Sequence, residues 1–152
     1  MRPGSVVNAA DRTRWLSSAS VSAPTPPAEI TGFDGLYGLQ ILEVSAEEVR
    51  AQVEVTDDHK QYFGLVHGGL YASMAESLAS IGTYLGVYEE GKTAMGLSNQ
   101  TSFLRPVFGG TVHAVARRRH RGRTTWLWEV DVTDDDGKLV ALGRMTIAVR
   151  AI

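Results

Sequence analysis

Two adjacent glycines and a carboxylate a short distance further on are the residues of this sequence best suited to chemistry. They are Gly68 and Gly69, which follow His67, and Glu76. Glycine permits close approach of a ligand, and the first amides of a helix have no partner within it, so amides here could bind a developing oxyanion. Each feature also has a plainer explanation, as a turn, a helix cap or a structural histidine. Only their combination points to catalysis.

These residues are expected on one helix, residues 68–86. Its apolar residues follow the helical period and form one stripe, which consists of Leu70, Met74, Leu78, Ile81 and Leu85. Projection places Glu76 nearly opposite this stripe, with Ser73, Ser80 and Thr83 on its own side. Small residues fill further positions and would let a sheet approach the backbone; they include Ala72, Ala75, Ala79, Gly82 and Gly86. Glu76 is therefore either a solvated residue of an amphipathic helix or a functional carboxylate, and periodicity does not choose between the two.

Strand patterns lie on both sides of this helix in the sequence. Residues 38–55 alternate between apolar and polar side chains with a period of two, and later segments alternate or are rich in β-branched and aromatic residues. These later segments are residues 93–104, 111–121, 124–133 and 138–149. Glycine and aspartate turn signals separate the last three, which predicts an antiparallel meander. The expected fold class is α+β, with one helix packed against an antiparallel sheet.

The 152 residues fit one domain, and 43% hydrophobic with 21% charged residues exclude a disordered or membrane-embedded class. Residues 1–30 are expected to form a disordered or extended tail, and residues 31–152 the domain. The net charge of −2 gives no general attraction to nucleic acid or to a membrane surface. The sequence has no cysteine, which excludes disulfides and a cysteine nucleophile, and no apolar run near the start suits a signal peptide. We expect a cytoplasmic protein.

Two further sites can be considered and rejected. The four histidines, His59, His67, His113 and His120, show no metal-binding spacing, so neither a metal nor another cofactor is predicted. The segment 86–93 matches the phosphate-loop pattern G-x-x-x-x-G-K-[ST] letter for letter. However, a phosphate loop follows a strand and opens a helix, whereas this segment closes a helix and leads into a strand. It is predicted to be a helix exit.

The segment Gln61–Tyr62–Phe63–Gly64–Leu65–Val66–His67–Gly68–Gly69, followed by Glu76, resembles the hotdog-fold thioesterases. Within that group it looks most like the 4-hydroxybenzoyl-CoA thioesterases that carry their acid on the central helix. The likeness spans roughly residues 35–150 and includes Val53–Asp57, Thr101–Phe103, Arg105–Val107, Thr124–Trp126 and Ala148–Arg150. The resemblance implies a central helix wrapped by a curved antiparallel sheet, and hydrolysis of an acyl-CoA thioester.

Carried over residue by residue, the resemblance also implies roles at the site. Glu76 would attack the thioester or activate water, and the Gly68 amide would polarise the carbonyl oxygen. Gln61 and His67 would orient these groups. Ser80 stands one turn after the acid, where threonine is expected in the aryl-CoA enzymes. The hydroxyl is thus kept without the methyl group, which affects the fit of the substrate more than the chemistry.

The family's contacts to the nucleotide of coenzyme A map to Arg105, Arg123, Thr124 and Arg150. Arg123 departs from the small hydroxyl residue that is more common there. The segment 117–123 holds five arginines, and guanidinium groups bind phosphates in a bidentate manner, so some of these should be ligand contacts. Alternation aims only every second one at a given face, and a solvated basic strand end explains the cluster equally well.

The resemblance finally implies a homodimer or a dimer of dimers with the active site between subunits. Glu76 and Ser80 of one subunit would face Gln61, His67 and Gly68 of the other. Three alternatives remain: a thioesterase for arylacetyl-CoA or aliphatic acyl-CoA, a non-catalytic domain that binds acyl-CoA, and a nucleic-acid-binding module built on residues 117–123. A carboxylate aimed at a thioester favours the enzyme over the binding domain.

Overall fold

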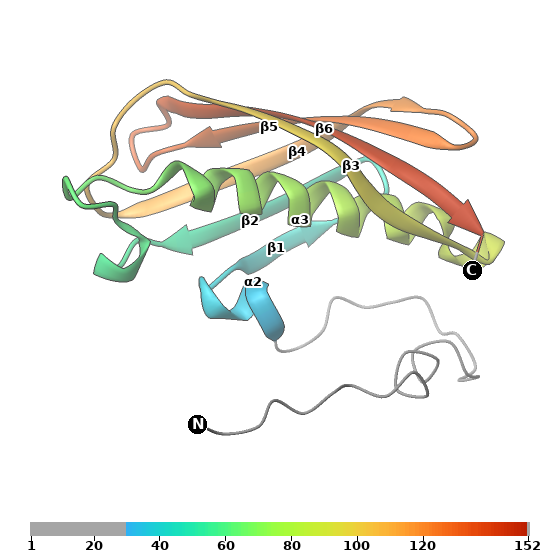
Figure 1. The fold of residues 1–152 in the computed structure, drawn as a ribbon, viewed down its shortest axis with the longest axis horizontal. Helices are drawn as coiled ribbons and strands as arrows, with labels where there is room; N and C mark the ends of the chain where they lie inside the picture. Colours follow the sequence, from blue (N-terminus) through green and yellow to red (C-terminus); the bar gives the residue numbers. More distant parts are fainter. Residues whose placement is uncertain (1–29, 152) are drawn as a thin grey trace, which may run out of the picture.

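The computed structural model describes residues 30–151, so the predicted tail falls almost wholly outside the described residues. One long helix, α3, lies against a single six-stranded sheet (Figure 1). In chain order the elements are α2 (Gly32–Leu36), β1 (Gln40–Val44), β2 (Glu48–Glu54), η2 (Asp57–His59), α3 (Gly68–Val87), η3 (Tyr88–Glu90), β3 (Lys92–Phe103), β4 (Thr111–Arg121), β5 (Thr125–Thr133) and β6 (Leu139–Ala151). This is the predicted α+β hotdog arrangement. The short helices α2, η2 and η3 were not predicted.

The strand order is β1-β2-β4-β5-β6-β3, and every pairing is antiparallel. The predicted meander is confirmed as β4, β5 and β6, which are neighbours in both sequence and space. The order places β1 and β3 at the two edges. Within residues 30–151, β3 pairs with β6 alone, so its second edge has no strand beside it.

The helix approaches the sheet closely because glycines line the face that meets it. A Cβ atom added at Gly82 would lie 2.5 Å from Cη2 of Trp128, and one at Gly86 would collide with Trp126. Both tryptophan rings are almost fully buried and stack at a centroid distance of 6.5 Å. The small residues of the helix therefore make room for two large residues of the sheet, as the sequence predicted.

The buried face of α3 is rotated relative to the predicted stripe. Leu70, Met74 and Leu78 are buried as predicted, but Ile81 and Leu85 are only partly buried. Thr83, predicted on the polar side with Glu76, is fully buried, so that prediction was wrong. Its hydroxyl donates to the Ala79 carbonyl at 2.8 Å and accepts from Nε1 of Trp128 at 2.9 Å, which satisfies both groups inside the core. Periodicity could not foresee a polar partner on a distant strand.

The segment that matches the phosphate-loop pattern is a helix exit, as predicted. α3 ends at Val87, the 3-10 turn η3 follows, and β3 begins at Lys92. Gly91 takes a φ of 66°, in the left-handed region that glycine adopts without strain, and its amide donates to Tyr88. Lys92 pairs with Glu90 at 2.5 Å. The lysine that would hold a phosphate is thus paired with a carboxylate of the same turn.

Candidate active site

A tight loop leads the chain into α3. The Gln61 amide donates to the Leu65 carbonyl at 2.8 Å, and the Gly64 amide donates to the Gln61 carbonyl at the same distance. Gly64 has a φ of 82°, which favours glycine. The His67 amide then donates to the His59 carbonyl at 2.8 Å, so the end of the loop is fixed to η2. This bonding holds Gln61 and His67 beside the start of the helix.

His67 is the N-cap of α3. Its Nδ1 accepts a hydrogen bond from the Gly69 amide at 2.9 Å, and its carbonyl accepts from Leu70 at 3.0 Å. An accepting Nδ1 requires the neutral tautomer with its proton on Nε2. Within residues 30–151, the Gly68 amide donates no hydrogen bond. That amide is a free donor at the positive end of a 20-residue helix.

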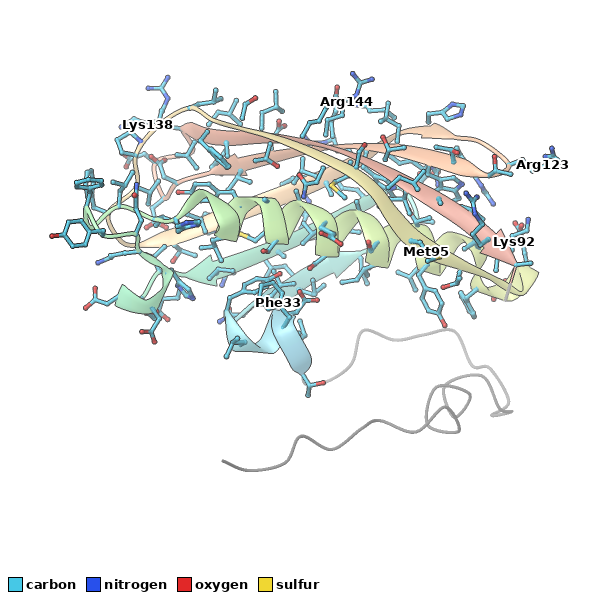
Figure 2. The ribbon with its side chains drawn as sticks, in the orientation of Figure 1. Phe33, Lys92, Met95, Arg123, Lys138 and Arg144 are labelled. Atoms are coloured by element: carbon cyan, nitrogen blue, oxygen red, sulfur yellow. The ribbon has the colours of Figure 1, made fainter. Side chains whose placement is uncertain are left out.

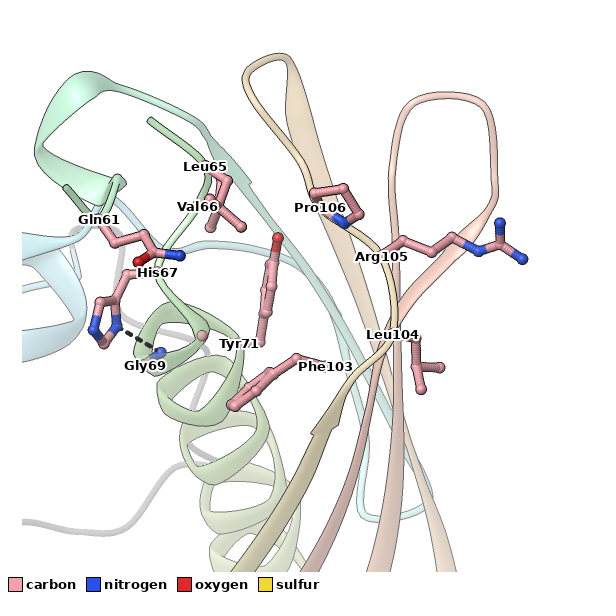
Figure 3. A pocket seen from close by; sticks show the side chains of 11 residues that line it. Gln61, Leu65, Val66, His67, Gly69, Tyr71, Phe103, Leu104, Arg105 and Pro106 are labelled. Carbon is pink, nitrogen blue, oxygen red and sulfur yellow. Dashed lines mark hydrogen bonds between the residues drawn. The ribbon is translucent and has the colours of Figure 1, made fainter. Parts of the chain in front are cut away.

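Gly68 lines a cavity of about 540 Å³ at the start of the helix (Figure 3). Its lining residues are Gln61, Leu65, Val66, His67, Gly68, Gly69, Tyr71, Phe103, Leu104, Arg105 and Pro106. Five residues singled out from the sequence therefore gather around one cavity, namely Gln61, His67, Gly68, Gly69 and Arg105. The other lining side chains are largely apolar, which suits the acyl part of a ligand.

The ring of Phe103 lies directly against Gly68. A Cβ atom added at Gly68 would lie 2.7 Å from Cζ of Phe103 and within 2.9 Å of two further ring atoms. The ring also packs against Tyr71 at a centroid distance of 6.3 Å (Figure 3). Tyr71 was not singled out from the sequence, and Phe103 appeared there only as part of a longer likeness. A helix projection places Tyr71 on the apolar side and gives no sign of the cavity beside it.

Glu76 and Ser80 lie elsewhere on the same helix. Glu76 is exposed and lies beside β3, where a Cβ atom at Gly96 would be 3.4 Å from its Oε1. Gly68 is eight residues earlier, which at about 1.5 Å per residue is about 12 Å along the helix axis. Neither Glu76 nor Ser80 lines the cavity. One chain therefore does not bring the acid to the Gly68 amide.

A hydrogen-bonded group next to Glu76 was also missed. Oδ1 of Asp34, in α2, accepts from the Ser77 hydroxyl at 2.6 Å and from the Tyr37 hydroxyl at 2.8 Å. Burial raises the pKa of Tyr37, and the negative charges of Asp34 and Glu76 raise it further. Asp34 and Ser77 are 43 positions apart, so no local pattern could pair them. The contact joins α2 to the helix that carries the acid.

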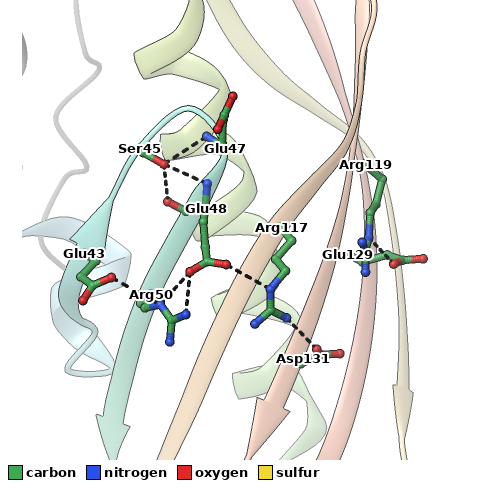
Figure 4. A network of polar contacts seen from close by, with 9 residues as sticks. All are labelled: Glu43, Ser45, Glu47, Glu48, Arg50, Arg117, Arg119, Glu129 and Asp131. Atoms are coloured by element: carbon green, nitrogen blue, oxygen red, sulfur yellow. Dashed lines mark hydrogen bonds and ion pairs between the residues drawn. The ribbon is translucent and has the colours of Figure 1, made fainter.

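Four of the clustered arginines on β4 are bound to carboxylates. Arg117 donates to Glu48 and to Asp131, each at 3.0 Å, and Arg119 donates to Glu129 at 2.6 Å (Figure 4). The remaining two pairs are Arg118 with Glu47 at 3.2 Å and Arg121 with Glu90 at 3.3 Å. A hydrogen bond from Arg50, with the charges of Arg50 and Arg117, lowers the pKa of Glu48. Much of the cluster therefore belongs to ion pairs within the chain.

Arg123, Thr124 and Arg150 come together at one end of the molecule. Nη1 of Arg150 donates to the Thr124 carbonyl at 3.3 Å. Arg123 lines a second cavity of about 260 Å³, formed by Val87, Glu90, Lys92, Arg121, Gly122, Arg123, Trp126 and Val149. Within residues 30–151, Arg123 makes no ion pair and no side-chain hydrogen bond, in contrast to the four arginines before it. It is available to a ligand.

The two groups of predicted contacts lie at opposite ends of β3. Arg105 follows its last residue, Phe103, whereas Arg123 and Arg150 lie beside its first, Lys92. Figure 2 places Arg123 and Lys92 at one end of the molecule and Lys138 at the other. Arg105 lies near Lys138, since its charge acts on the pKa of that lysine. A strand of 12 residues spans about 36 Å at about 3.3 Å per residue. A single chain does not unite the two groups.

Two wider properties bear on the class of site. No three histidine, aspartate or glutamate side chains gather into a possible metal site among residues 30–151. No helix in that part of the chain is both long and apolar enough to cross a membrane.

The family model of the thioesterase superfamily matches residues 63–141, which include the end of the loop, Gly68, Glu76 and Arg105. A Mycobacterium tuberculosis protein named as an esterase is 38% identical over 130 residues, covering 84% of this chain and 93% of its own. Its solved structure superposes with a TM-score of 0.77, covering 79% of this chain and 97% of that one.

Two further relatives carry more specific names. The 1,4-dihydroxy-2-naphthoyl-CoA hydrolase of Listeria monocytogenes is 35% identical over 119 residues, covering 78% of this chain and 96% of its own. A solved thioesterase of Haemophilus influenzae is 26% identical, with a TM-score of 0.73, and covers 97% of this chain and 93% of its own. The similarity to named thioesterases thus extends along nearly all of the described fold.

Proposed function

This chain belongs to the thioesterase superfamily and is a thioester hydrolase, and on that premise we propose that it cleaves an aromatic acyl-CoA into the free acid and coenzyme A. One observation carries the proposal: the Gly68 amide has no acceptor in the described chain, and Gly68 lines a cavity of about 540 Å³. In this reaction the carbonyl oxygen becomes negatively charged as the tetrahedral intermediate forms. A preorganised amide at a helix start stabilises that charge more than it stabilises the substrate.

The active site takes its groups from two subunits. In the described part of the chain β3 is an edge strand with no neighbour on one side, and Met95 and Leu97 on it are each 57% exposed. Two such edges can meet about a two-fold axis, where an antiparallel pairing sets the Phe103 end of one strand beside the Lys92 end of its partner. The same pairing moves Glu76, which lies against the middle of β3, toward the Gly68 amide of the other subunit.

Glu76 supplies the base or the nucleophile in this arrangement. As a base it takes a proton from water, whose oxygen bonds to the carbonyl carbon; the carbon–sulfur bond then breaks, and the coenzyme A thiolate takes up a proton. As a nucleophile its carboxylate bonds to the carbonyl carbon and expels the coenzyme A thiolate, and water then cleaves the resulting anhydride to the free acid and the restored carboxylate. Gln61, through its side-chain amide, and Ser80, through its hydroxyl, orient the carbonyl or the water. His67 holds the first turn of the helix and thereby the position of the Gly68 amide.

The coenzyme A nucleotide is bound by arginines from both strand ends. Arg105 of one subunit and Arg123 and Arg150 of the other would form one basic site once two β3 edges pair, with Thr124 offering its hydroxyl and backbone. Arg123 supports this site best, because no carboxylate of residues 30–151 neutralises it. Guanidinium groups suit the pyrophosphate and ribose phosphate of coenzyme A.

An aromatic acyl group is supported by two facts. The aromatic rings of Phe103 and Tyr71 line the cavity beside Gly68, and flat rings stack favourably on such walls. A relative at 35% identity is named for an aryl substrate, 1,4-dihydroxy-2-naphthoyl-CoA. Arylacetyl-CoA and aliphatic acyl-CoA are the competing substrates.

A panel of benzoyl-, hydroxybenzoyl-, phenylacetyl- and hexanoyl-CoA, with release of the free thiol measured, tests the proposal. We expect the highest kcat/KM for an aryl thioester, and Glu76→Gln should abolish most of the release from every substrate. A higher kcat/KM for hexanoyl-CoA than for all aryl thioesters would replace the aromatic substrate by an aliphatic one. Tight binding without any thiol release would identify a binding domain instead.

A further inference from the structure

Tyr71, in the first turn of α3, carries a buried hydroxyl without a partner. The residue is 2% exposed. Among the buried side-chain nitrogen and oxygen atoms of residues 30–151, only the Tyr71 hydroxyl makes no hydrogen bond. Phenylalanine at this place would fill nearly the same volume without the cost of burying an unpaired polar group. The hydroxyl therefore calls for a partner that residues 30–151 do not supply.

The surroundings of the hydroxyl belong to the cavity at the start of the helix. The Tyr71 ring is part of the cavity wall together with Leu65, Val66 and Pro106. Figure 3 shows the hydroxyl pointing into the gap between Val66 and Pro106, away from Phe103. These neighbours are apolar side chains, so they cannot accept or donate a hydrogen bond. A polar atom that enters this gap would find the phenol as its partner.

Position and protonation both suit the recognition of an acyl group. Tyr71 lies three residues after Gly68, so the two share one turn of the helix and face one cavity. Burial raises the pKa of Tyr71 to about 12, which keeps the phenol protonated and able to donate at neutral pH. An acyl group whose carbonyl oxygen meets the Gly68 amide can extend from there toward the phenol.

We propose that Tyr71 is a specificity-determining residue whose hydroxyl bonds a polar substituent, such as a ring hydroxyl, on the acyl group of the substrate. The inference rests on the proposed thioesterase function and narrows its substrate class to hydroxylated aryl thioesters. The phenol is shielded from solvent in the free chain, so the ligand reaches it through a small shift of the wall. Pro106, on one side of the hydroxyl, is exposed and has room for that shift.

The test compares Tyr71→Phe with the wild-type enzyme on benzoyl-CoA and on 3- and 4-hydroxybenzoyl-CoA. We expect the variant to lose roughly tenfold or more in kcat/KM on at least one hydroxylated substrate, and less than about twofold on benzoyl-CoA. Tyr84→Phe is the matched control, since Tyr84 is a 42% exposed tyrosine of the same helix, and it should leave every ratio unchanged. Equal losses on all three substrates, or no loss on any, would overturn the role of Tyr71.

Thermal unfolding without ligand separates this role from a purely structural one. If no group in the free protein partners the hydroxyl, Tyr71→Phe should keep or raise the Tm. A clear drop in Tm would mean that an ordered water or a neighbouring subunit already satisfies the phenol, and the proposal would fall. If the wild-type enzyme cleaves no thioester at all, the proposed function is wrong. In that case, calorimetric affinities of the wild type and of Tyr71→Phe for benzoyl-CoA and the two hydroxybenzoyl-CoA compounds decide the role of Tyr71.

Discussion

The ring of Phe103 occupies the space that a Cβ atom at Gly68 would need, so a larger residue there has to displace either the ring or the backbone. Gly68→Val should therefore displace the amide and lower kcat by roughly two to three orders of magnitude, the usual scale for a lost oxyanion contact. Single-turnover kinetics per folded active site measure this loss. Gly109→Val is a suitable control, since no atom lies within 4 Å of a Cβ atom added there. A variant that loses only thermal stability would indicate a plain structural turn.

A substitution at Glu76 should affect catalysis and not folding, because this side chain is exposed in one chain. Glu76→Gln removes the charge and keeps the shape, so the protein should fold and assemble normally while kcat falls by roughly a hundredfold or more. Steady-state kinetics together with size-exclusion chromatography measure both effects. Glu54→Gln, on an exposed end of β2, should change neither. Near-normal turnover of the Glu76 variant would remove the acid from the mechanism.

At the scale of the elements, the contact between α3 and the sheet depends on glycines, which leave room for the tryptophan rings of the sheet. Gly82→Ala should destabilise the fold by about 1 to 3 kcal/mol, because the added methyl group meets the Trp128 ring at 2.5 Å. Urea unfolding gives the free energy of unfolding directly. The sign of the change in the free energy of unfolding is informative, since alanine in place of glycine at an unobstructed helical site stabilises by about 0.5 to 1 kcal/mol. A stabilised variant would mean that helix and sheet are not packed as described.

The arginines at the two ends of β3 are proposed to bind the nucleotide of coenzyme A, and substitutions there test this. Arg105→Ala and Arg150→Ala should each weaken acyl-CoA substrates by about 1 to 3 kcal/mol, while a pantetheine thioester that lacks the nucleotide should barely change. The ratio of kcat/KM values for the two substrates cancels general damage to the site. Arg119→Ala, whose side chain pairs with Glu129, should behave as wild type. Equal losses on both substrates would make the two arginines structural.

The sequence predicted the strands and the long helix better than the contacts between them. The strands and the long helix followed from hydrophobic period and turn signals, because those patterns are local. Thr83 was misplaced because its partner, Trp128, lies 45 positions away, and Asp34 was missed for the same reason. The basic segment 117–123 could not be divided into paired and free arginines, since the pairing depends on the register of β4 with β2 and β5.

At the scale of the whole molecule, the proposed site is complete only in an assembly. Gln61, His67 and Gly68 lie at one end of the chain, Glu76 lies about 12 Å further along the helix, and Arg123 and Arg150 lie at the far end of β3. The proposed pairing of two β3 edges would unite all three groups in each of two sites. Leu97→Arg should therefore break both assembly and activity, because it places a charge among the exposed apolar residues of that edge. The sedimentation coefficient, measured by sedimentation velocity, and kcat/KM should fall together in this variant. An active monomer would contradict the proposed interface.

Mixing two inactive subunits tests the central claim most directly. Co-expressed Glu76→Gln and Gly68→Val chains, each with its own tag, yield mixed dimers after two-step purification. In such a dimer one site holds the intact Gly68 of one chain and the intact Glu76 of the other, while the second site holds both changes. We predict that the purified mixed dimer recovers about half of the wild-type activity, since one of its two sites is restored. A mixed dimer as inactive as its parents would show that each active site lies within a single chain.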